Sequence, residues 1–205
     1  MNSKLYILQH PNEEKRCLRT ARILELGCPQ GHCEVIKGKK FSANKHPQIK
    51  QLMKDERTLI LFPSTSAVQM EEIPPNLPYN LVLIDGTWSQ ARSMYFNSPD
   101  LHSLKKVVIN VGRPSNYVIR TQPNESCLST VESAAQALAH LEGNPSLYEE
   151  LTRPLTALCS FQLEHGAVHH YSKEYLVMNN LYDKPVTRKL RKKIGKIKET
   201  KKTLS

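Results

Sequence analysis

The chain has 205 residues, 39% of them hydrophobic, which suits one domain with a sizeable core. It contains no run of eighteen apolar residues and no signal-peptide pattern at its start, so a membrane-spanning or secreted protein is not expected. We expect instead an intracellular protein, in the cytoplasm, the nucleus or both.

The formal net charge is +10, and nearly all of this excess lies in a C-terminal tail, residues 184–205. The tail contains ten Lys or Arg and a single acid, Glu199. A basic tail of this kind is typical of RNA binding, in which it would bind phosphates without sequence specificity and with a strong dependence on salt. A solvated surface and a localisation signal are the alternatives. We therefore expect one folded domain over residues 1–183, followed by this tail.

The five cysteines are scattered, odd in number and without a C-x-x-C pair. This pattern argues against a disulfide framework and against a standard zinc cluster. His32 and the pair His169-His170 also lack ligand spacing to any cysteine. We expect reduced thiols, surface histidines and no bound metal.

Strand and helix patterns alternate along the chain, which favours an α/β fold with a parallel sheet over segregated layers. Residues 12–26 have the pattern of one helix that stops at Gly27. Its apolar face would comprise Leu18, Ala21, Leu24 and Leu26. Apolar, β-rich runs predict strands at Leu5–Leu8, Cys33–Lys37, Thr58–Phe62, Tyr79–Ile84 and Lys106–Asn110.

The C-terminal half is predominantly helical in pattern. Residues 127–139 are rich in alanine and predict a helix that ends near Gly143 and packs closely on its neighbours. A second helical pattern covers Leu147–Glu164 and is interrupted at Pro154, and a short last turn is expected at Lys173–Asn179.

The most informative stretch is residues 81–90, where an apolar strand ends at a carboxylate and a helix begins two residues later. Asp85-Gly86 is a turn signal, and Thr87 with Gln90 matches the S/T-x-x-E/Q capping box that opens helices. Because ligands bind at the carboxyl edge of parallel sheets, Asp85 is expected at the lip of a cleft.

Three loops are expected to meet at this edge: the loop after Phe62, residues 85–88 and residues 127–130. Ser129 and Glu132 form a second capping box, so the last two loops both open helices. Such a cleft would hold a small ligand with an apolar group the size of adenine, bound through backbone amides. The sequence lacks G-x-G-x-x-G and G-x-x-x-x-G-K-[ST], so it does not support classical dinucleotide binding or a P-loop for phosphate. It also lacks G-x-S-x-G, the turn that carries a nucleophilic serine.

The tetrad Asp85-Gly86-Thr87-Trp88 resembles the D-x-T-W signature of the DTW-domain family of tRNA-uridine aminocarboxypropyltransferases. The resemblance covers most of the chain, and the pattern at residues 84–91 and 161–167 is most similar to one branch of that family. Four residues alone would be weak support, whereas a longer ordered set is specific. The further matching segments are Leu8–Pro11, Glu14-Lys15, Leu18–Thr20, Leu59–Ser64, Tyr117–Arg120, Cys127–Thr130, Glu132, Arg153–Leu155 and Cys159–Gln162.

The resemblance implies a SPOUT-like fold, in which helices flank a parallel sheet, a C-terminal segment forms a trefoil knot and S-adenosylmethionine binds at the knot. It implies transfer of the 3-amino-3-carboxypropyl group of S-adenosylmethionine to N3 of a tRNA uridine in the D-loop, leaving 5′-methylthioadenosine, without a metal. Residues 1–183 would be the catalytic domain. The residues expected to bind the cofactor are Phe62, Pro63, Ser64, Ile84, Asp85, Thr87, Trp88, Cys127, Leu128, Ser129, Thr130 and Glu132.

Asp85 and Trp88 are the expected catalytic residues. A carboxylate is ordinarily a weak base for an imide N–H, so Asp85 would need desolvation to take the N3 proton of uridine. Otherwise it would accept a hydrogen bond from N3–H, bind the cofactor's ammonium group, or serve only as a structural residue of the turn. Trp88 would wall the pocket or stack on a ring, with a core tryptophan as the alternative. For Ser129, Thr130 and Glu132, capping of the helix and contact with the cofactor are both open as roles.

The tRNA is expected to meet basic side chains of both the domain and the tail. Arg16, Arg19 and Arg22 recur three residues apart along the first predicted helix and would meet phosphates, with a solvated helix face as the alternative. Tyr117 would stack on or clamp the target nucleotide, which must be accessible in a loop or flipped. The residues expected to bind RNA are Arg16, Arg19, Arg92, Arg113, Tyr117, Arg120, Arg188, Lys189, Arg191, Lys192 and Lys193.

One departure from the family pattern lies at the start of the chain. Family members often carry a cysteine-rich, metal-binding segment ahead of the first strand, and this sequence begins directly at that strand. We expect a shortened form, or tRNA docking that relies more on the basic tail.

Two other functions remain as alternatives. A SPOUT-type RNA methyltransferase would use the same cofactor and methylate its RNA. A non-catalytic RNA-binding module would bind tRNA and show no saturable binding of S-adenosylmethionine.

Overall fold

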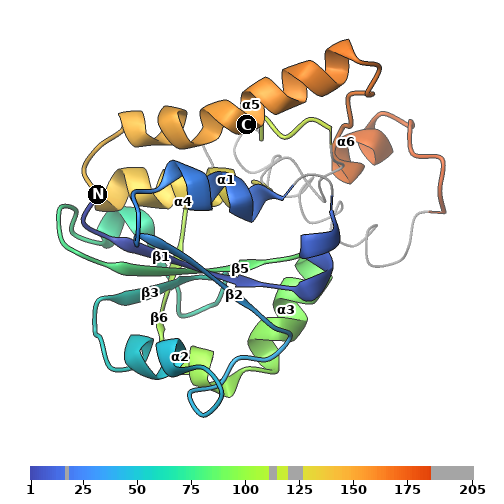
Figure 1. Ribbon diagram of the computed structural model, residues 1–205. Coiled ribbons are helices and arrows are strands. Elements are labelled where there is room, and N and C mark those ends of the chain that lie inside the picture. Colours follow the sequence, from blue (N-terminus) through green and yellow to red (C-terminus); the bar gives the residue numbers. More distant parts are fainter. Residues whose placement is uncertain (17–18, 111–114, 120–126, 186–205) are drawn as a thin grey trace, which may run out of the picture.

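A computed structural model describes residues 1–16, 19–110, 115–119 and 127–185 (Figure 1). Within these residues the chain forms a sheet of six parallel strands in the order β2-β1-β5-β3-β6-β4. The expected α/β class and parallel sheet are therefore confirmed. The strands are β1 (Lys4–Gln9), β2 (Cys33–Lys37), β3 (Thr58–Leu61), β4 (Val68–Gln69), β5 (Asn80–Asp85) and β6 (Lys105–Val108).

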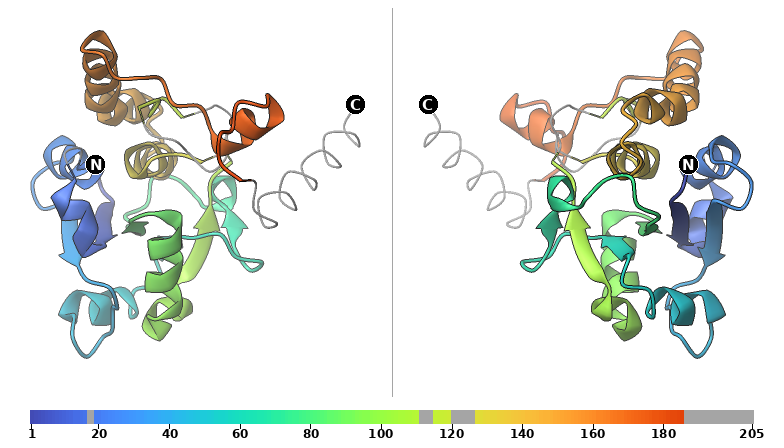
Figure 2. Two further views of the ribbon diagram at one scale, coloured as in Figure 1. Left: turned by 90° about the vertical axis from the view of Figure 1, so that its right-hand side faces the viewer. Right: turned by 90° about the vertical axis from the view of Figure 1, so that its left-hand side faces the viewer.

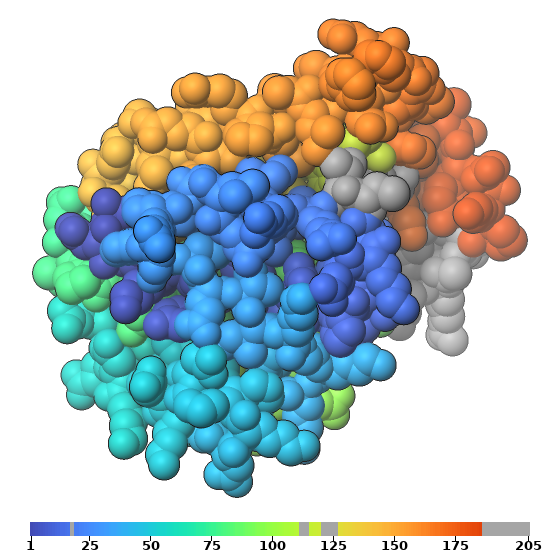
Figure 3. Space-filling view, viewed as in Figure 1, coloured from blue at the N-terminus to red at the C-terminus, as the bar shows by residue number. Residues whose placement is uncertain are grey.

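Helices cover both faces of the sheet (Figure 1, Figure 2). One face carries α1 (Thr20–Gly27), α4 (Thr130–Leu141) and α5 (Ser146–Glu164), and the other carries α2 (Pro47–Leu52) and α3 (Trp88–Phe96). Helix α5 runs along the top of the molecule above α1 (Figure 3). The short helix α6 (Lys173–Met178) lies beyond the end of α5. Three 3-10 turns complete the described elements: η1 (Pro11–Lys15), η2 (Met70–Glu72) and η3 (Pro99–Ser103).

Alternate residues of the central strands face two separate cores. In β5, Leu81 and Leu83 pack toward α1, α4 and α5, whereas Val82 packs toward α2 and α3. Ile7 and Leu8 of β1 divide in the same way. Because both faces are covered, these strands are continuous apolar runs, which explains why the sequence predicts them.

The prediction of a single helix over residues 12–26 is wrong. His10 caps the turn η1, its Nδ1 accepting from the Asn12 N–H at 3.2 Å, and the chain is extended again at Arg16 and Arg19 before α1 begins. Two short elements therefore replace one helix. Leu26, assigned to the apolar face, is 71% exposed, while Ala21 and Leu24 are buried as expected. Leu18 lies outside the described residues.

Pro154 does not interrupt the second C-terminal helix, contrary to the prediction. Helix α5 runs continuously for 19 residues with Pro154 inside it. Leu151, Leu155 and Cys159 are buried against α4 and α1, and this packing outweighs the hydrogen bond that proline removes. Pro154 itself is exposed, so water can bond the carbonyl that it frees. No helix in the described ranges is both long and apolar enough to span a bilayer.

Candidate functional site

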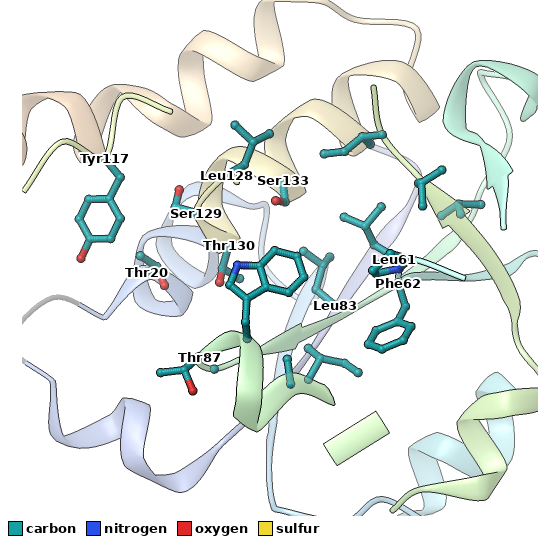
Figure 4. A pocket seen from close by; sticks show the side chains of 18 of the residues that line it. Thr20, Leu61, Phe62, Leu83, Thr87, Tyr117, Leu128, Ser129, Thr130 and Ser133 are labelled. Carbon is teal, nitrogen blue, oxygen red and sulfur yellow. The ribbon is translucent and has the colours of Figure 1, made fainter. Parts of the chain in front are cut away.

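A cavity of about 760 Å³ lies at the carboxyl edge of β3, β5 and β6 (Figure 4). Its size is within the usual range for small-ligand sites. In Figure 4, Ser129, Thr130 and Ser133 at the start of α4 face Leu61, Phe62 and Leu83 from the strand ends. The three loops that the sequence predicted to converge do line it together.

Most of the residues expected to bind the cofactor lie on the cavity wall. The described wall is mainly apolar and aromatic, with hydroxyl groups on the side of α4. The expected residues found there are Phe62, Pro63, Ile84, Thr87, Trp88, Leu128, Ser129 and Thr130. A site of this composition suits an apolar ring system with a few polar attachments.

Four of the expected residues, Ser64, Asp85, Cys127 and Glu132, do not line the cavity. Ser64 is exposed and its hydroxyl is hydrogen-bonded with that of Ser66 at 3.2 Å. Cys127 and Glu132 are buried, with 6% and 0% exposure. These side chains support the wall or lie beside it.

Asp85 lies directly behind the wall, at the end of β5, and only 3% of it is exposed. One carboxylate oxygen accepts a hydrogen bond from Gln9 Nε2 at 3.0 Å, and the other accepts one from Thr130 Oγ1 at 2.6 Å. Its carbonyl accepts from the His10 N–H at 2.8 Å. Asp85 therefore ties the end of β1 to the start of α4, and Thr130, which lines the cavity, separates the carboxylate from the ligand space.

Trp88 is the first residue of α3 and is 47% exposed on the cavity wall, so it is not a core tryptophan. The predicted capping box holds it in place: the Thr87 N–H donates to Gln90 Oε1 at 2.8 Å, and the Gln90 N–H donates to Thr87 Oγ1 at 3.3 Å. An exposed indole beside an apolar cavity can stack on a ligand ring.

The second predicted capping box is also present, and its acid has further partners. Glu132 accepts from the N–H and Oγ of Ser129 at 2.8 and 2.7 Å, from Ser115 Oγ at 2.7 Å and from the Asn116 N–H at 2.6 Å. The Glu132 N–H donates to Ser129 Oγ at 3.2 Å. This carboxylate joins α4 to the segment that carries Tyr117, which explains its complete burial.

Phe62 is fixed from behind by an aromatic cluster. Its ring stacks on Tyr95 of α3, with centroids 3.9 Å apart and planes at 16°. Burial raises the pKa of Tyr95, so its hydroxyl stays protonated near neutral pH. The stack thus packs this part of the cavity wall against α3.

The arginines expected to bind RNA that the structure describes, Arg16, Arg19 and Arg92, do not share one helix face. Arg16 and Arg19 precede α1, and only Arg22 belongs to it, so the predicted alignment of these three is wrong. Arg16 pairs with Glu13 at 2.9 Å, and the guanidinium of the exposed Arg92 lies 5.9 Å from the ring centroid of Phe96. The remaining basic residues of that prediction, Arg113, Arg120, Arg188, Lys189, Arg191, Lys192 and Lys193, lie outside the described residues.

Tyr117 is the aromatic side chain expected to stack on or clamp the target nucleotide. It is 5% exposed and lines the cavity beside α4, so it belongs to the ligand site as much as to an RNA surface (Figure 4).

No site role was predicted for several wall residues: Thr20, residues 107–110 at and just after the end of β6, Ser133 and Lys173. A signal existed for β6, because the carboxyl ends of parallel strands share an edge. Thr20 belongs to one of the family-matching segments, Leu18–Thr20, but no site role followed from it, and no local pattern marks Lys173. Among the residues that the structure describes, no group of His, Cys, Asp or Glu is arranged to hold a metal ion.

The parallel sheet and the cavity at its carboxyl edge define an α/β protein with a small-ligand site at the ends of three strands. The sequence pattern of the DTW domain matches residues 1–163, so the chain belongs to the DTW-domain family. The expected family is confirmed.

Relatives with curated names cover nearly the whole chain. A Drosophila melanogaster protein named tRNA-uridine aminocarboxypropyltransferase 2 is 50% identical over 192 residues, which are 93% of this chain and 76% of that protein. Proteins of the same name from Macaca fascicularis and Mus musculus are 44% and 45% identical over 195 residues. Those are 94% of this chain and 65% of either relative, so the chain spans about two thirds of their length. No solved structure matches the chain.

Proposed function

We propose that the chain is a tRNA-uridine aminocarboxypropyltransferase, which moves the 3-amino-3-carboxypropyl group of S-adenosylmethionine to N3 of a tRNA uridine, in the D-loop. The single observation that carries this proposal is 50% identity over 93% of the chain to a relative of that name. The cavity supports it, since about 760 Å³ with apolar walls and α4 hydroxyls suits a nucleoside with a polar chain.

S-adenosylmethionine supplies three activated carbons on one sulfonium. The reaction forms the N3–carbon bond as the sulfur–carbon bond breaks, with the electron pair going to sulfur, and the N3–H bond breaks, with its proton leaving to the group that accepts the N3–H hydrogen bond. The protein must therefore select one carbon by orientation. Phe62 and Trp88 would hold the adenosine part between apolar surfaces. The remaining task is to receive the uridine with its N3–H directed at an acceptor.

Thr130 is the group best placed for that task. It donates its hydroxyl proton to Asp85, so its oxygen keeps its lone pairs for the cavity and can accept the hydrogen bond of uridine N3–H. The buried negative charge behind it makes that oxygen a better acceptor. As N3 attacks, its proton passes to Thr130 Oγ1 while the hydroxyl proton of Thr130 passes to Asp85. Asp85 thus acts through Thr130, and Gln9 holds its second oxygen in place.

The proposed activity is tested by incubating the protein with tRNA and S-adenosylmethionine and then analysing the nucleosides by mass spectrometry. We expect aminocarboxypropyluridine and 5′-methylthioadenosine. A methyl-sized increment alone would support the methyltransferase alternative, and calorimetry without saturable binding of S-adenosylmethionine would support the RNA-binding module.

The roles of Asp85 and Thr130 are tested with Thr130→Val and Asp85→Asn. Each should lower the modification rate by about 100-fold, the low end for groups that handle a proton, with little change in tRNA affinity. Thr130→Ser keeps the hydroxyl and is the matched control. Equal losses of rate and of tRNA affinity would assign both residues to binding instead.

We also propose the finer features that the family resemblance implies: a SPOUT-like fold with a C-terminal trefoil knot, and an intracellular location. The all-parallel sheet with its site at the carboxyl edge supports the first. An experimental structure that traces the whole chain is the test of the knot. Imaging of a fluorescent fusion tests the location.

The basic tail, residues 184–205, is proposed as a second tRNA contact. Its excess of Lys and Arg supports this role. Replacing Arg191, Lys192 and Lys193 by Ala should weaken tRNA binding and reduce its dependence on salt, measured by titration at several salt concentrations. An unchanged salt dependence would favour a localisation signal.

A further inference from the structure

Lys173 is the only charged side chain on the described wall of the cavity. The other side chains there are apolar, aromatic, hydroxyl or amide groups. No described carboxylate is paired with the Lys173 ammonium. Any anionic group that enters this cavity therefore has one candidate counter-charge among the described side chains.

The structure fixes the backbone that carries Lys173. Ser172 caps α6, with its Oγ accepting from the Tyr175 N–H at 3.0 Å. Just before it, the His170 N–H donates to the Val118 carbonyl at 2.6 Å, which ties this segment to the one that carries Tyr117. The rings of Tyr171 and Tyr175 stack with centroids 4.6 Å apart. The start of α6 is thus anchored where Lys173, an exposed residue, borders the cavity.

The proposed donor carries a carboxylate at the end of the group that is transferred. A carboxylate in a mainly apolar site is costly to desolvate unless it is paired and hydrogen-bonded. Methyl transfer does not need this end of the molecule to be fixed, whereas aminocarboxypropyl transfer moves it. Recognition of the carboxylate is therefore a means of choosing which carbon is presented.

We propose that Lys173 binds the α-carboxylate of the aminocarboxypropyl group and so selects this group for transfer. The inference rests on the proposed function. Lys173 also lies outside residues 1–163, the part of the chain that matches the family pattern, so the matched DTW domain does not contain this contact.

The test is a set of calorimetric titrations with three ligands: S-adenosylmethionine, its decarboxylated form and 5′-methylthioadenosine. The wild-type protein should bind S-adenosylmethionine about tenfold more tightly than the decarboxylated form, as one charge-assisted pair can provide. In Lys173→Met this ratio should fall to about one, while affinity for 5′-methylthioadenosine, which lacks the chain, stays unchanged.

Lys173→Arg keeps the charge and should restore most of the preference. Lys45→Met is the matched control, because Lys45 is an exposed lysine that does not line the cavity. A wild-type protein without the preference, or Lys173→Met with the full preference, overturns the inference. Loss of 5′-methylthioadenosine binding in Lys173→Met also overturns it, because the residue would then be needed for the shape of the cavity.

Failure of the proposed function gives a different result. If the wild-type protein shows the preference and Lys173→Met loses it, but the tRNA product is methylated or unmodified, the carboxylate contact stands and aminocarboxypropyl transfer does not. If aminocarboxypropyluridine forms and Lys173→Met keeps the wild-type preference, only the inference about Lys173 fails.

Discussion

The two capping boxes at the cavity have the same sequence signature and different surroundings. At the start of α3, Gln90 accepts one hydrogen bond from Thr87, and the neighbouring Trp88 stays 47% exposed. At the start of α4, Glu132 is fully buried and accepts four hydrogen bonds from three residues. The first box presents a side chain to the ligand, and the second holds two segments of the wall together.

The difference follows from the side chain at the third helical position. A glutamine can close a cap and leave its remaining amide hydrogens to water, whereas a buried carboxylate must have its acceptor sites filled. Ser115 and Asn116 fill those of Glu132. The same local motif thus marks a presenting site in one place and a structural junction in the other.

The largest effect is expected from Glu132→Ala, which leaves several buried donors without an acceptor. The free energy of unfolding should fall by about 3 kcal/mol. Urea unfolding followed by circular dichroism measures it. Glu132→Gln keeps the volume and one acceptor and should lose less. A loss below about 1 kcal/mol for the alanine variant would mean that water replaces the carboxylate and that the contrast between the boxes is wrong.

The two cap residues provide a matched pair. Ser129→Ala should destabilise the protein by about 2 kcal/mol, because Ser129 is buried, and Thr87→Ala by about 1 kcal/mol. Both are measured as above. Equal losses at the two positions would show that burial of the second box adds nothing to its cap.

Trp88→Ala should act on binding rather than on folding. Affinity for S-adenosylmethionine should fall about tenfold, measured by calorimetry, because the indole would stack on the ligand. Stability should change little, because Trp88 is already 47% exposed in the free protein. Phe96→Ala is the control on the same helix, since Phe96 is 59% exposed and does not line the cavity. If both variants bind alike, Trp88 does not touch the ligand.

The smallest effect is expected from Gln90→Ala. One partly exposed hydrogen bond is lost, and the unfolding free energy should fall by about 0.5 kcal/mol. The measurement is again urea unfolding. A loss comparable to that of Glu132→Ala would remove the distinction between the two boxes.

Local patterns predicted much of the site. Both capping boxes, the strand that ends at Asp85 and the meeting of three loops follow from signals within a few residues of each other, because caps and buried parallel strands have local signatures. Strand β4 and helix α2, with two and six residues, were too short for any periodicity to reveal.

Features that depend on distant partners were not predictable. The sequence predicted Asp85 at the sheet edge. It did not predict the two side chains that donate to its carboxylate, because Gln9 and Thr130 lie 76 and 45 residues away in the sequence. The break between η1 and α1, where Arg16 and Arg19 are extended, has no local signal, because the helical pattern runs through these positions. Lys173 reaches the cavity only because the chain returns after α5.

Under the proposed function, the cavity orients S-adenosylmethionine so that the aminocarboxypropyl carbon, and not the methyl carbon, meets the uridine. Two preparations of the donor separate these carbons, one labelled in the methyl group and one in the aminocarboxypropyl group, each incubated with the protein and tRNA. We predict that the aminocarboxypropyl label enters the tRNA and that the methyl label leaves with 5′-methylthioadenosine. Methyl label in the tRNA, without label from the aminocarboxypropyl group, would show that the cavity presents the methyl carbon instead.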